Sequence, residues 1–128
     1  MRDLIYKDEC YRIYGICYDI QNLVGSVFSE RQYQDILEEK LKSDNIPYER
    51  EKELYFNIGK SKVGGNKVDF VVFNKIAIDL KTKRFITRED FGQMLRYLKS
   101  GQYKLGLIIN FRGRKVKISR VINSNISI

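Results

Sequence analysis

The stretch that most constrains the fold is residues 68–73, VDFVVF, in which the side chains on both faces are apolar with one exception. Successive strand residues point to opposite faces of a sheet, so a strand of this kind needs cover on both sides. It therefore belongs in the interior of a sheet that has other elements packed on both faces. The exception is Asp69, whose carboxylate is costly to bury unless it meets a partner.

Two amphipathic segments are predicted in the first third of the chain. Apolar residues recur at helical spacing over residues 1–24, which predicts one or two helices that end at Gly25. A second helical segment should begin at a cap provided by Ser26 or Ser29 and end before Pro47. The apolar stripes are Leu4, Ile13, Ile16, Cys17, Ile20 and Val24 in the first segment, and Tyr33, Ile36, Leu37 and Leu41 in the second.

A further helix is predicted to begin after Thr87, whose hydroxyl can cap it, with Glu89 and Asp90 in its first turn. Gly101 is expected to close this helix. Its expected buried side consists of Phe91, Met94, Leu95 and Leu98.

Runs rich in β-branched and aromatic residues predict strands in the rest of the chain. These runs are residues 53–58, 67–73, 76–81, 105–111 and 115–121. Turns are expected at residues 64–66, 74–75 and 112–113. Gly59-Lys60-Ser61 is expected to be a polar turn, because the earlier glycine of a phosphate-binding loop is missing.

The element order is helix, helix, three strands, helix and two strands. It predicts an α/β domain in which a mixed central β-sheet is flanked by α-helices. A chain of 128 residues can bury one core, so we expect a single domain over residues 1–122 and a C-terminal tail over residues 123–128. Cys10 and Cys17 are roughly 10 Å apart on one predicted helix, beyond disulfide reach, which favours core thiols in a reducing compartment.

Composition excludes several chemistries. The chain has no histidine, which removes Ser-His-Asp and Cys-His triads and histidine-ligated zinc. Two cysteines are too few for a zinc ribbon or a four-cysteine iron–sulfur cluster. Without a long apolar run, neither a transmembrane span nor a secretory signal is expected, and we expect a cytoplasmic protein without a membrane partner.

Positive charge is concentrated towards the C-terminus. Residues 81–128 contain twelve Lys and Arg against two Asp and Glu, whereas residues 1–80 are slightly acidic. Such a segment favours a polyanionic partner, most simply nucleic acid, although a basic surface kept for solubility would give the same count. The residues predicted to contact phosphates are Lys83, Arg84, Arg88, Arg96, Arg112, Arg114 and Lys115.

Three charged residues, Asp69, Asp79 and Lys81, lie within predicted core strands. Asp79 and Lys81 are two apart, so their side chains point to one face of the sheet. Two carboxylates and a strand carbonyl form an oxygen-rich set that suits Mg²⁺, and a lysine beside them can orient a water molecule. A buried Asp–Lys ion pair at a strand end is the simpler interpretation of the same pattern.

Strand parity sets a condition on this site. Asp69 and Asp79 share a face of an antiparallel pair only if the register is symmetric about residue 74, which requires a three-residue connection at residues 73–75. A two-residue turn at residues 74–75 without a bulge would send Asp79 to the opposite face.

Further candidates come from the helices. Glu30 begins the second helical segment on the stripe of Tyr33, which directs its carboxylate towards the sheet. Gln93 and Tyr97 are four apart on the helix after Lys81, so they share a face that can overlook the end of the Asp79 strand.

The order Asp69, Asp79-x-Lys81 and Gln93-x-x-x-Tyr97 resembles the PD-(D/E)XK nuclease superfamily, and its last element is similar to that of the RecB-type exonuclease branch. Over residues 13–121 the chain also resembles the GxxExxY family of small bacterial proteins. The matching landmarks include Gly15, Gly25, Glu30-x-x-Tyr33 and residues 105–111.

Three positions depart from the GxxExxY pattern. Val27 replaces the glycine that names the family, Gln21 replaces a histidine, and Asp79 replaces the usual glutamate. The shorter reach of Asp79 bears on metal geometry, but none of the departures removes a proposed ligand.

The resemblance implies a restriction-endonuclease-like fold and a metal-dependent nuclease that hydrolyses phosphodiester bonds, with DNA favoured over RNA. Lys81 would position or activate the attacking water, Gln93 would orient Lys81 or that water, and Tyr97 would pack behind the site or touch a phosphate. The ligands implied for Mg²⁺ or Mn²⁺ are the carboxylates of Glu30, Asp69 and Asp79 and the carbonyl of Leu80.

Two other functions fit the same residues. The first is a catalytically weak or inactive module that keeps the fold and binds nucleic acid. The second is a Holliday-junction resolvase, which would need a homodimer to cut two strands symmetrically; the sequence leaves the oligomeric state open.

Overall fold

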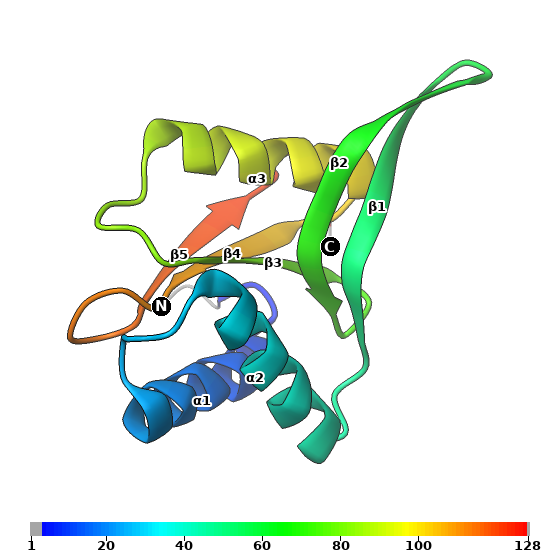
Figure 1. Ribbon diagram of the computed structural model, residues 1–128. Coiled ribbons are helices and arrows are strands. Elements are labelled where there is room, and N and C mark those ends of the chain that lie inside the picture. The colour runs from blue at the N-terminus through cyan, green and yellow to red at the C-terminus, as the bar shows by residue number, and fades with distance from the viewer. Residues whose placement is uncertain (1–3, 128) are drawn as a thin grey trace.

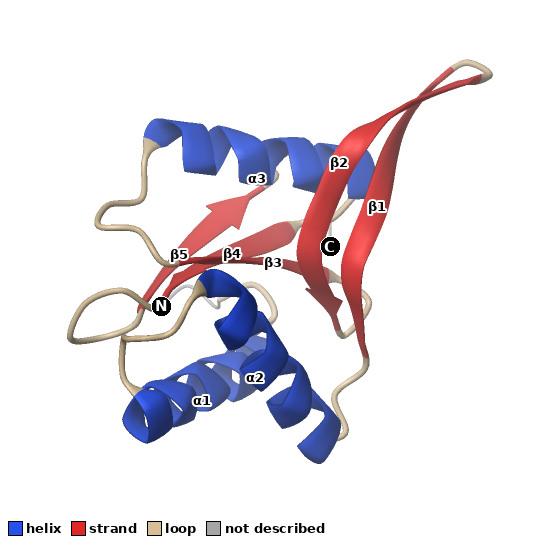
Figure 2. Ribbon diagram, viewed as in Figure 1, coloured by secondary structure: helices blue, strands red, loops and turns tan. Residues whose placement is uncertain are grey.

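The computed structural model describes residues 4–127, which form a five-stranded sheet with helices on both faces (Figures 1 and 2). The helices are α1 (Lys7–Val24), α2 (Glu30–Ser43) and α3 (Arg88–Gly101). The strands are β1 (Tyr48–Ile58), β2 (Ser61–Val72), β3 (Ile76–Lys81), β4 (Leu105–Asn110) and β5 (Lys117–Ile122), and they follow this order across the sheet. β3 and β4 are parallel and the other neighbours antiparallel, which confirms the predicted mixed α/β fold.

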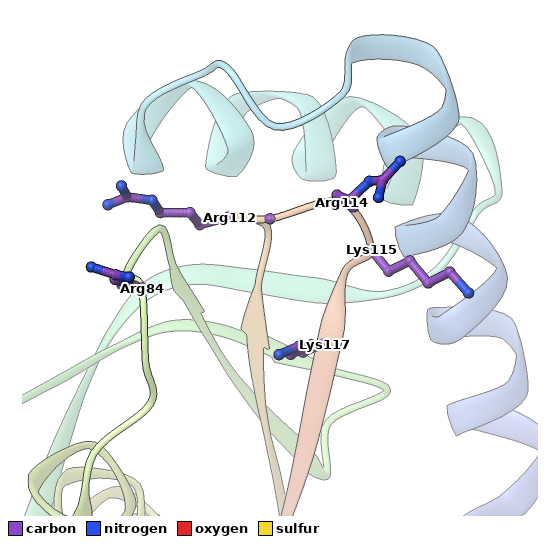
Figure 3. A pocket seen from close by; sticks show the side chains of 6 residues that line it. Arg84, Arg112, Arg114, Lys115 and Lys117 are labelled. Carbon is purple, nitrogen blue, oxygen red and sulfur yellow. The ribbon is translucent and has the colours of Figure 1, made fainter.

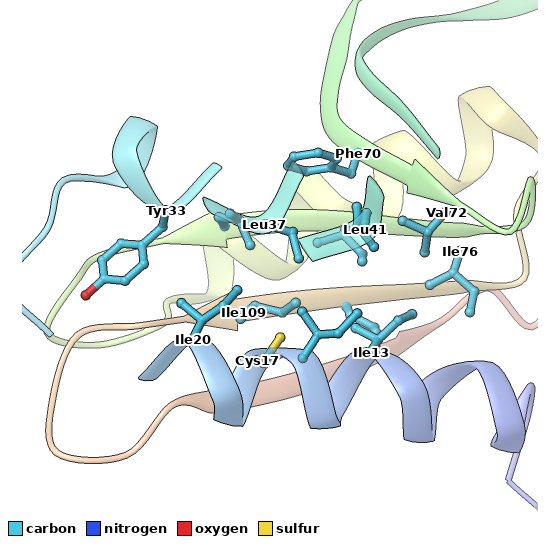
Figure 4. Close-up of a cluster of buried hydrophobic side chains, with 14 of the residues drawn as sticks. Ile13, Cys17, Ile20, Tyr33, Leu37, Leu41, Phe70, Val72, Ile76 and Ile109 are labelled. Carbon is cyan, nitrogen blue, oxygen red and sulfur yellow. The ribbon is translucent and has the colours of Figure 1, made fainter. Parts of the chain in front are cut away.

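Two hydrophobic cores bury the two faces of the sheet. α1 and α2 cover one face and α3 covers the other, as Figure 1 shows. Figure 4 shows α1 and α2 packed against sheet residues that include Phe70, Val72, Ile76 and Ile109. β2 lies between β1 and β3 and supplies side chains to both cores, so the predicted interior position of its apolar stretch is confirmed.

The helix starts agree with the capping signals. Ser29, rather than Ser26, caps α2, and its hydroxyl accepts from the backbone N–H of Gln32 at 3.2 Å. Thr87 caps α3 in the same way, through the N–H of Asp90. α1 is one helix that begins at Lys7, so the expectation that Leu4 joins its apolar stripe is wrong; Leu4 precedes the helix and is exposed. Residues 1–3 of that predicted segment, and residue 128 of the predicted tail, lie outside the described residues.

The expected burial of the two cysteines is confirmed. Cys10 and Cys17 are buried free thiols. Among residues 4–127, no helix combines the length and apolar character needed to cross a bilayer.

The predicted turn at residues 64–66 is wrong. The turn between β1 and β2 is Gly59-Lys60. A polar turn was predicted here, but not as the connection between these two strands. Both strands are therefore longer than predicted. Gly64 and Gly65 instead lie within β2, where the register shifts opposite Tyr55. Gly65 has φ of 93°, a conformation that glycine adopts readily and that some types of β-bulge use. Adjacent glycines signal both turns and bulges, which is why the sequence did not separate the two.

The buried face of α3 is rotated from the predicted one. Phe91 and Leu95 are 37% and 46% exposed, so their expected burial is wrong. Asp90 and Tyr97 are buried instead, because both face the end of β3 rather than solvent. The helix also continues through Gly101, and Gln102 in a left-handed conformation forms the C-cap.

Close packing between α3 and β4 depends on Gly106. A Cβ at this position would lie 2.4 Å from Sδ of Met94, which is itself buried. We predict that Gly106→Ala lowers the free energy of unfolding by about 1–3 kcal/mol, because the α3-side core is overpacked. Gly15→Ala, on an α1 position with free space around it, should instead raise stability by about 0.5–1 kcal/mol. Urea unfolding of the two variants measures both changes, and equal losses would contradict this account.

Candidate active site

The register of β2 and β3 brings two carboxylates together. The pairs are Val72 with Ile76, Val71 with Ala77 and Phe70 with Ile78, all symmetric about residue 74. The connection is therefore residues 73–75, with Phe73 and Asn74 at positive φ. The parity condition is confirmed, and continuing the register places Asp69 opposite Asp79.

Asp69 lies where β2 leaves β3. The paired residues end at Phe70 and Ile78, and beyond them the backbone N–H of Leu80 donates to Oδ2 of Asp69 at 2.8 Å. The carboxylate thus satisfies a backbone donor that the ladder no longer reaches. On the other side of β3, the carbonyl of Lys81 accepts from the N–H of Phe111 next to β4. Because successive strand carbonyls alternate in direction, the carbonyl of Leu80 points towards the Asp69 side.

Lys81 is held by three groups at the end of β3. Its Nζ lies 3.1 Å from Oδ2 of Asp79 and donates to Oε1 of Gln93 at 3.0 Å. Asp90 lies further away, at 3.8 Å. The side chain of Lys81 is only 15% exposed, so β3 and α3 together fix its ammonium group. The simpler interpretation of the D-x-K pattern, an ion pair at a strand end, describes this geometry correctly.

Glu30 and Tyr97 border the same group of charges. Burial raises the pKa of Glu30, while nearby Lys81 lowers it and Asp79 raises it. Burial raises the pKa of Tyr97 to about 12, with further contributions from Asp79 and Asp69. The charged and phenolic side chains predicted for the site therefore influence one another's pKa values at the carboxyl end of β3. These are Glu30, Asp69, Asp79, Lys81 and Tyr97.

Asp69 is the most perturbed carboxyl group of this cluster. Burial, followed by repulsion from Asp79, raises its pKa from 3.8 to about 7. The hydrogen bond from Leu80 lowers the pKa and offsets only part of that rise. Two carboxyl groups at one place thus favour a shared proton or a cation.

A basic hollow adjoins this end of the sheet. It has a volume of about 800 Å³, and Figure 3 shows the cationic side chains around it. Its lining residues are Arg84, Arg112, Gly113, Arg114, Lys115 and Lys117. Four of these were predicted to contact phosphates, and Lys117, at the start of β5, was not among the predicted residues. The other predicted cations, Lys83, Arg88 and Arg96, do not line it.

Two side-chain amides form hydrogen bonds with the backbone of the loops that line the basic hollow. Asn110 accepts from the backbone N–H groups of Lys83 and Arg112, each at 3.2 Å, and donates to the carbonyl of Lys83 at 2.7 Å. Gln21 of α1 accepts from the N–H of Val116 at 2.6 Å, at the far end of the 111–116 connection. The loop after β3 and the loop after β4 are therefore tied together at their bases.

Comparison with known proteins identifies the family. A family model described as the PD-(D/E)XK nuclease superfamily matches residues 7–121, which includes every predicted catalytic residue. The chain belongs to the PD-(D/E)XK nuclease superfamily. No curated protein matches it.

Two solved structures are similar to this superfamily member. SSO0001 aligns with a TM-score of 0.58 and 21% identity over 73% of this chain, which spans about half, 49%, of the SSO0001 chain. The alkaline exonuclease LHK-Exo from Laribacter hongkongensis aligns with a TM-score of 0.52 and 14% identity, over 98% of this chain and 73% of that chain. At these identities the similarity establishes the fold.

PD-(D/E)XK nucleases usually use divalent metal ions, which require several oxygen ligands around one point. Within residues 4–127, no three Asp, Glu or Cys side chains are gathered closely enough to hold an ion. Glu30, Asp69 and Asp79 thus share one end of the sheet without surrounding a common point. Asp69 and Asp79 nevertheless fit a cation, because their oxygens are hard ligands and because burial, followed by repulsion from Asp79, raises the pKa of Asp69.

Asp90 is the residue of this site that the sequence interpretation missed. It was assigned only to the first turn of α3, yet it is buried and accepts from Nζ of Lys83 at 2.8 Å. Lys83, which is predicted to bind phosphate, forms this ion pair within the protein. An acidic residue three positions after a capping threonine was the available signal, and it fitted a cap equally well.

The raised pKa of Asp69 predicts a pH-dependent contribution to stability. Between pH 3.8 and about 7 the native carboxyl keeps a proton that the unfolded chain has released. This contribution is complete below that window and is lost as pH rises through it. Asn at this position cannot ionise and can still accept from the Leu80 N–H. In EDTA, the stability of Asp69→Asn relative to wild type should therefore rise by on the order of 2 kcal/mol across the window.

Urea unfolding at several pH values measures this difference, with Asp19→Asn, on the exposed surface of α1, as the control. A constant difference between Asp69→Asn and wild type would show that the pKa of Asp69 is not raised.

Proposed function

We propose that this chain is a metal-dependent nuclease that hydrolyses phosphodiester bonds in DNA. The observation that carries the proposal is the convergence of Asp69, Asp79, Lys81 and Gln93 where β2 and β3 part, in a chain of the PD-(D/E)XK nuclease superfamily. Mg²⁺ or Mn²⁺ bound there would stabilise negative charge on the phosphate and lower the pKa of water.

Each residue has a distinct role in this proposal. Asp69, Asp79 and the carbonyl of Leu80 would hold the cation, and Glu30, at the same end of the sheet but not gathered around the same point, would become a further ligand only if its side chain moved towards them. Lys81 orients the attacking water, whose oxygen forms a bond to phosphorus as the bond to the leaving oxygen breaks. Gln93 fixes Lys81 through the 3.0 Å hydrogen bond, and Tyr97 packs behind the carboxylates.

Phosphate recognition is assigned to the basic hollow. Its five cationic side chains come from the segment after β3, the connection after β4 and the start of β5, and positive charge attracts a polyanion irrespective of sequence. Preference for DNA, cytoplasmic location and membership of the GxxExxY group are parts of the same proposal. The first rests on the superfamily resemblance, the second on the free core thiols Cys10 and Cys17, and the third on the pattern of residues 13–121.

A binding module without turnover is the alternative that a specific observation favours. Lys81 and Asp79 already neutralise each other, and Lys83 and Asp90 form a second pair. A closed network of ion pairs can stabilise the fold without catalysis. A homodimeric Holliday-junction resolvase would use the same residues and would cut branched DNA selectively.

Metal binding is expected to depend on Asp69. Mg²⁺ or Mn²⁺ should raise the melting temperature of the wild type by several degrees, since an ion at 100 times its dissociation constant adds about 2.7 kcal/mol. Asp69→Asn should lose both this shift and cleavage, whereas Asp19→Asn should keep both. The measurements are thermal melts with each ion or EDTA, and incubation with single-stranded, duplex and branched DNA and with RNA.

The outcomes separate the alternatives. A metal-induced shift that persists in Asp69→Asn would place the ion elsewhere. Salt-sensitive binding without cleavage of any substrate would support the binding module, and selective cleavage of branched DNA would support the resolvase.

Nucleic-acid affinity should fall steeply with salt. Each duplex phosphate neutralised contributes roughly −0.9 to the slope of log K against log salt concentration. Arg114→Glu, in the hollow, should weaken binding to different sequences alike and make the slope less negative by about 1. Lys7→Glu carries the same charge change on α1 and is the control. Titration of labelled DNA in EDTA gives both values, and equal effects of the two variants would refute this assignment of the hollow.

A further inference from the structure

The connection between β3 and α3 presents an exposed phenylalanine beside the candidate active site. Phe85 is 68% exposed, whereas Phe28 and Phe91, which also lie close in sequence to site residues, are 36% and 37% exposed. A phenylalanine has no polar group to interact with water, so this exposure is unfavourable unless a partner covers the ring. The assigned roles of the site leave Phe85 unexplained.

The residues on either side of Phe85 are fixed. Asn110 binds both the N–H and the carbonyl of Lys83. Ile86 packs against the α3-side core, and the N–H of Thr87 donates to Asp90 at 2.8 Å. Phe85 therefore lies on a short segment with anchored ends, and little conformational freedom remains to be lost when its ring is covered.

Phe85 is also joined to the basic hollow through Arg84. The guanidinium of Arg84 lies over the Phe85 ring, 5.5 Å from its centroid, and the same side chain lines the hollow in Figure 3. A cation for a phosphate and a flat apolar surface are therefore adjacent in the chain. Surfaces that bind single-stranded nucleic acid combine these two elements, because each nucleotide offers one phosphate and one flat base.

We propose that Phe85 stacks on an unpaired nucleobase of the strand whose phosphates occupy the basic hollow. Nucleic acid with unpaired nucleotides next to the cut is then the substrate class of this site, an inference that rests on the proposed function. Within a duplex, bases are stacked on each other and offer only their edges in the grooves, so the face of the Phe85 ring has nothing to cover it there.

The test is the fluorescence of a short DNA strand that carries one 2-aminopurine base, measured in EDTA with the full chain. A duplex whose two ends are closed by non-nucleotide linkers is the paired probe. Phe85→Tyr keeps a flat ring, whereas Phe85→Leu keeps apolar volume without one. Tyr11→Ala removes an exposed aromatic side chain from α1 and is the matched control.

We expect wild type and Phe85→Tyr to change the 2-aminopurine emission and to bind the single strand alike. Phe85→Ala and Phe85→Leu should bind it about 5-fold or more weakly, the size of one lost base–aromatic stack. Binding of the closed duplex should be unchanged in every variant, and Tyr11→Ala should match wild type throughout.

Three results would overturn the inference. Phe85→Ala could bind both probes as wild type does, Phe85→Leu could retain the affinity for the single strand, or both probes could lose affinity equally. The second result would indicate an apolar contact, such as one with another protein. Failure of wild type to bind either probe would contradict the proposed function itself, which separates the two failures.

Discussion

The hydrogen bond from the Leu80 N–H to Asp69 is the contact on which the site depends. It occurs where β2 and β3 stop pairing, and it gives a backbone donor the partner that the ladder would otherwise provide. The same bond fixes a carboxyl group opposite Asp79. Burial of this carboxyl group, followed by repulsion from Asp79, raises the pKa of Asp69 to about 7. The backbone of β3 thus holds Asp69, while Lys81 pairs with Asp79.

Charge in this region is divided into two parts that the composition does not distinguish. Lys81 and Lys83 are paired with Asp79 and Asp90, so they neutralise the acidic end of β3. The cations that line the basic hollow belong to loops and to β5, and its lining includes no acidic residue among those the structure describes. The number of cations available to an anion is therefore smaller than the net charge of the C-terminal segment suggests.

The sequence predicts features set by local chemistry and by strand parity. The caps at Ser29 and Thr87 are signalled by residues within one helical turn. If Asp69 and Asp79 are to share a face of the sheet, the register must be symmetric about residue 74, and this condition predicts the three-residue connection that the structure has. The misses depend on interactions between distant elements. The rotation of α3 follows from contacts with β3, and the glycine pair at residues 64 and 65 reveals a bulge only when β1 is aligned beside it.

The amides of Asn110 and Gln21 enclose the 111–116 connection at its two ends. Substitutions or insertions between Asn110 and Val116 would alter the length and charge of the loop, while β4 and β5 would keep their register. Such a loop is a natural place for insertions, since its length is uncoupled from the geometry of the acidic pair. Relatives with one catalytic core can thus diverge in the shape of nucleic acid they accept, and grafting loops of other lengths at this point offers a route to altered selectivity.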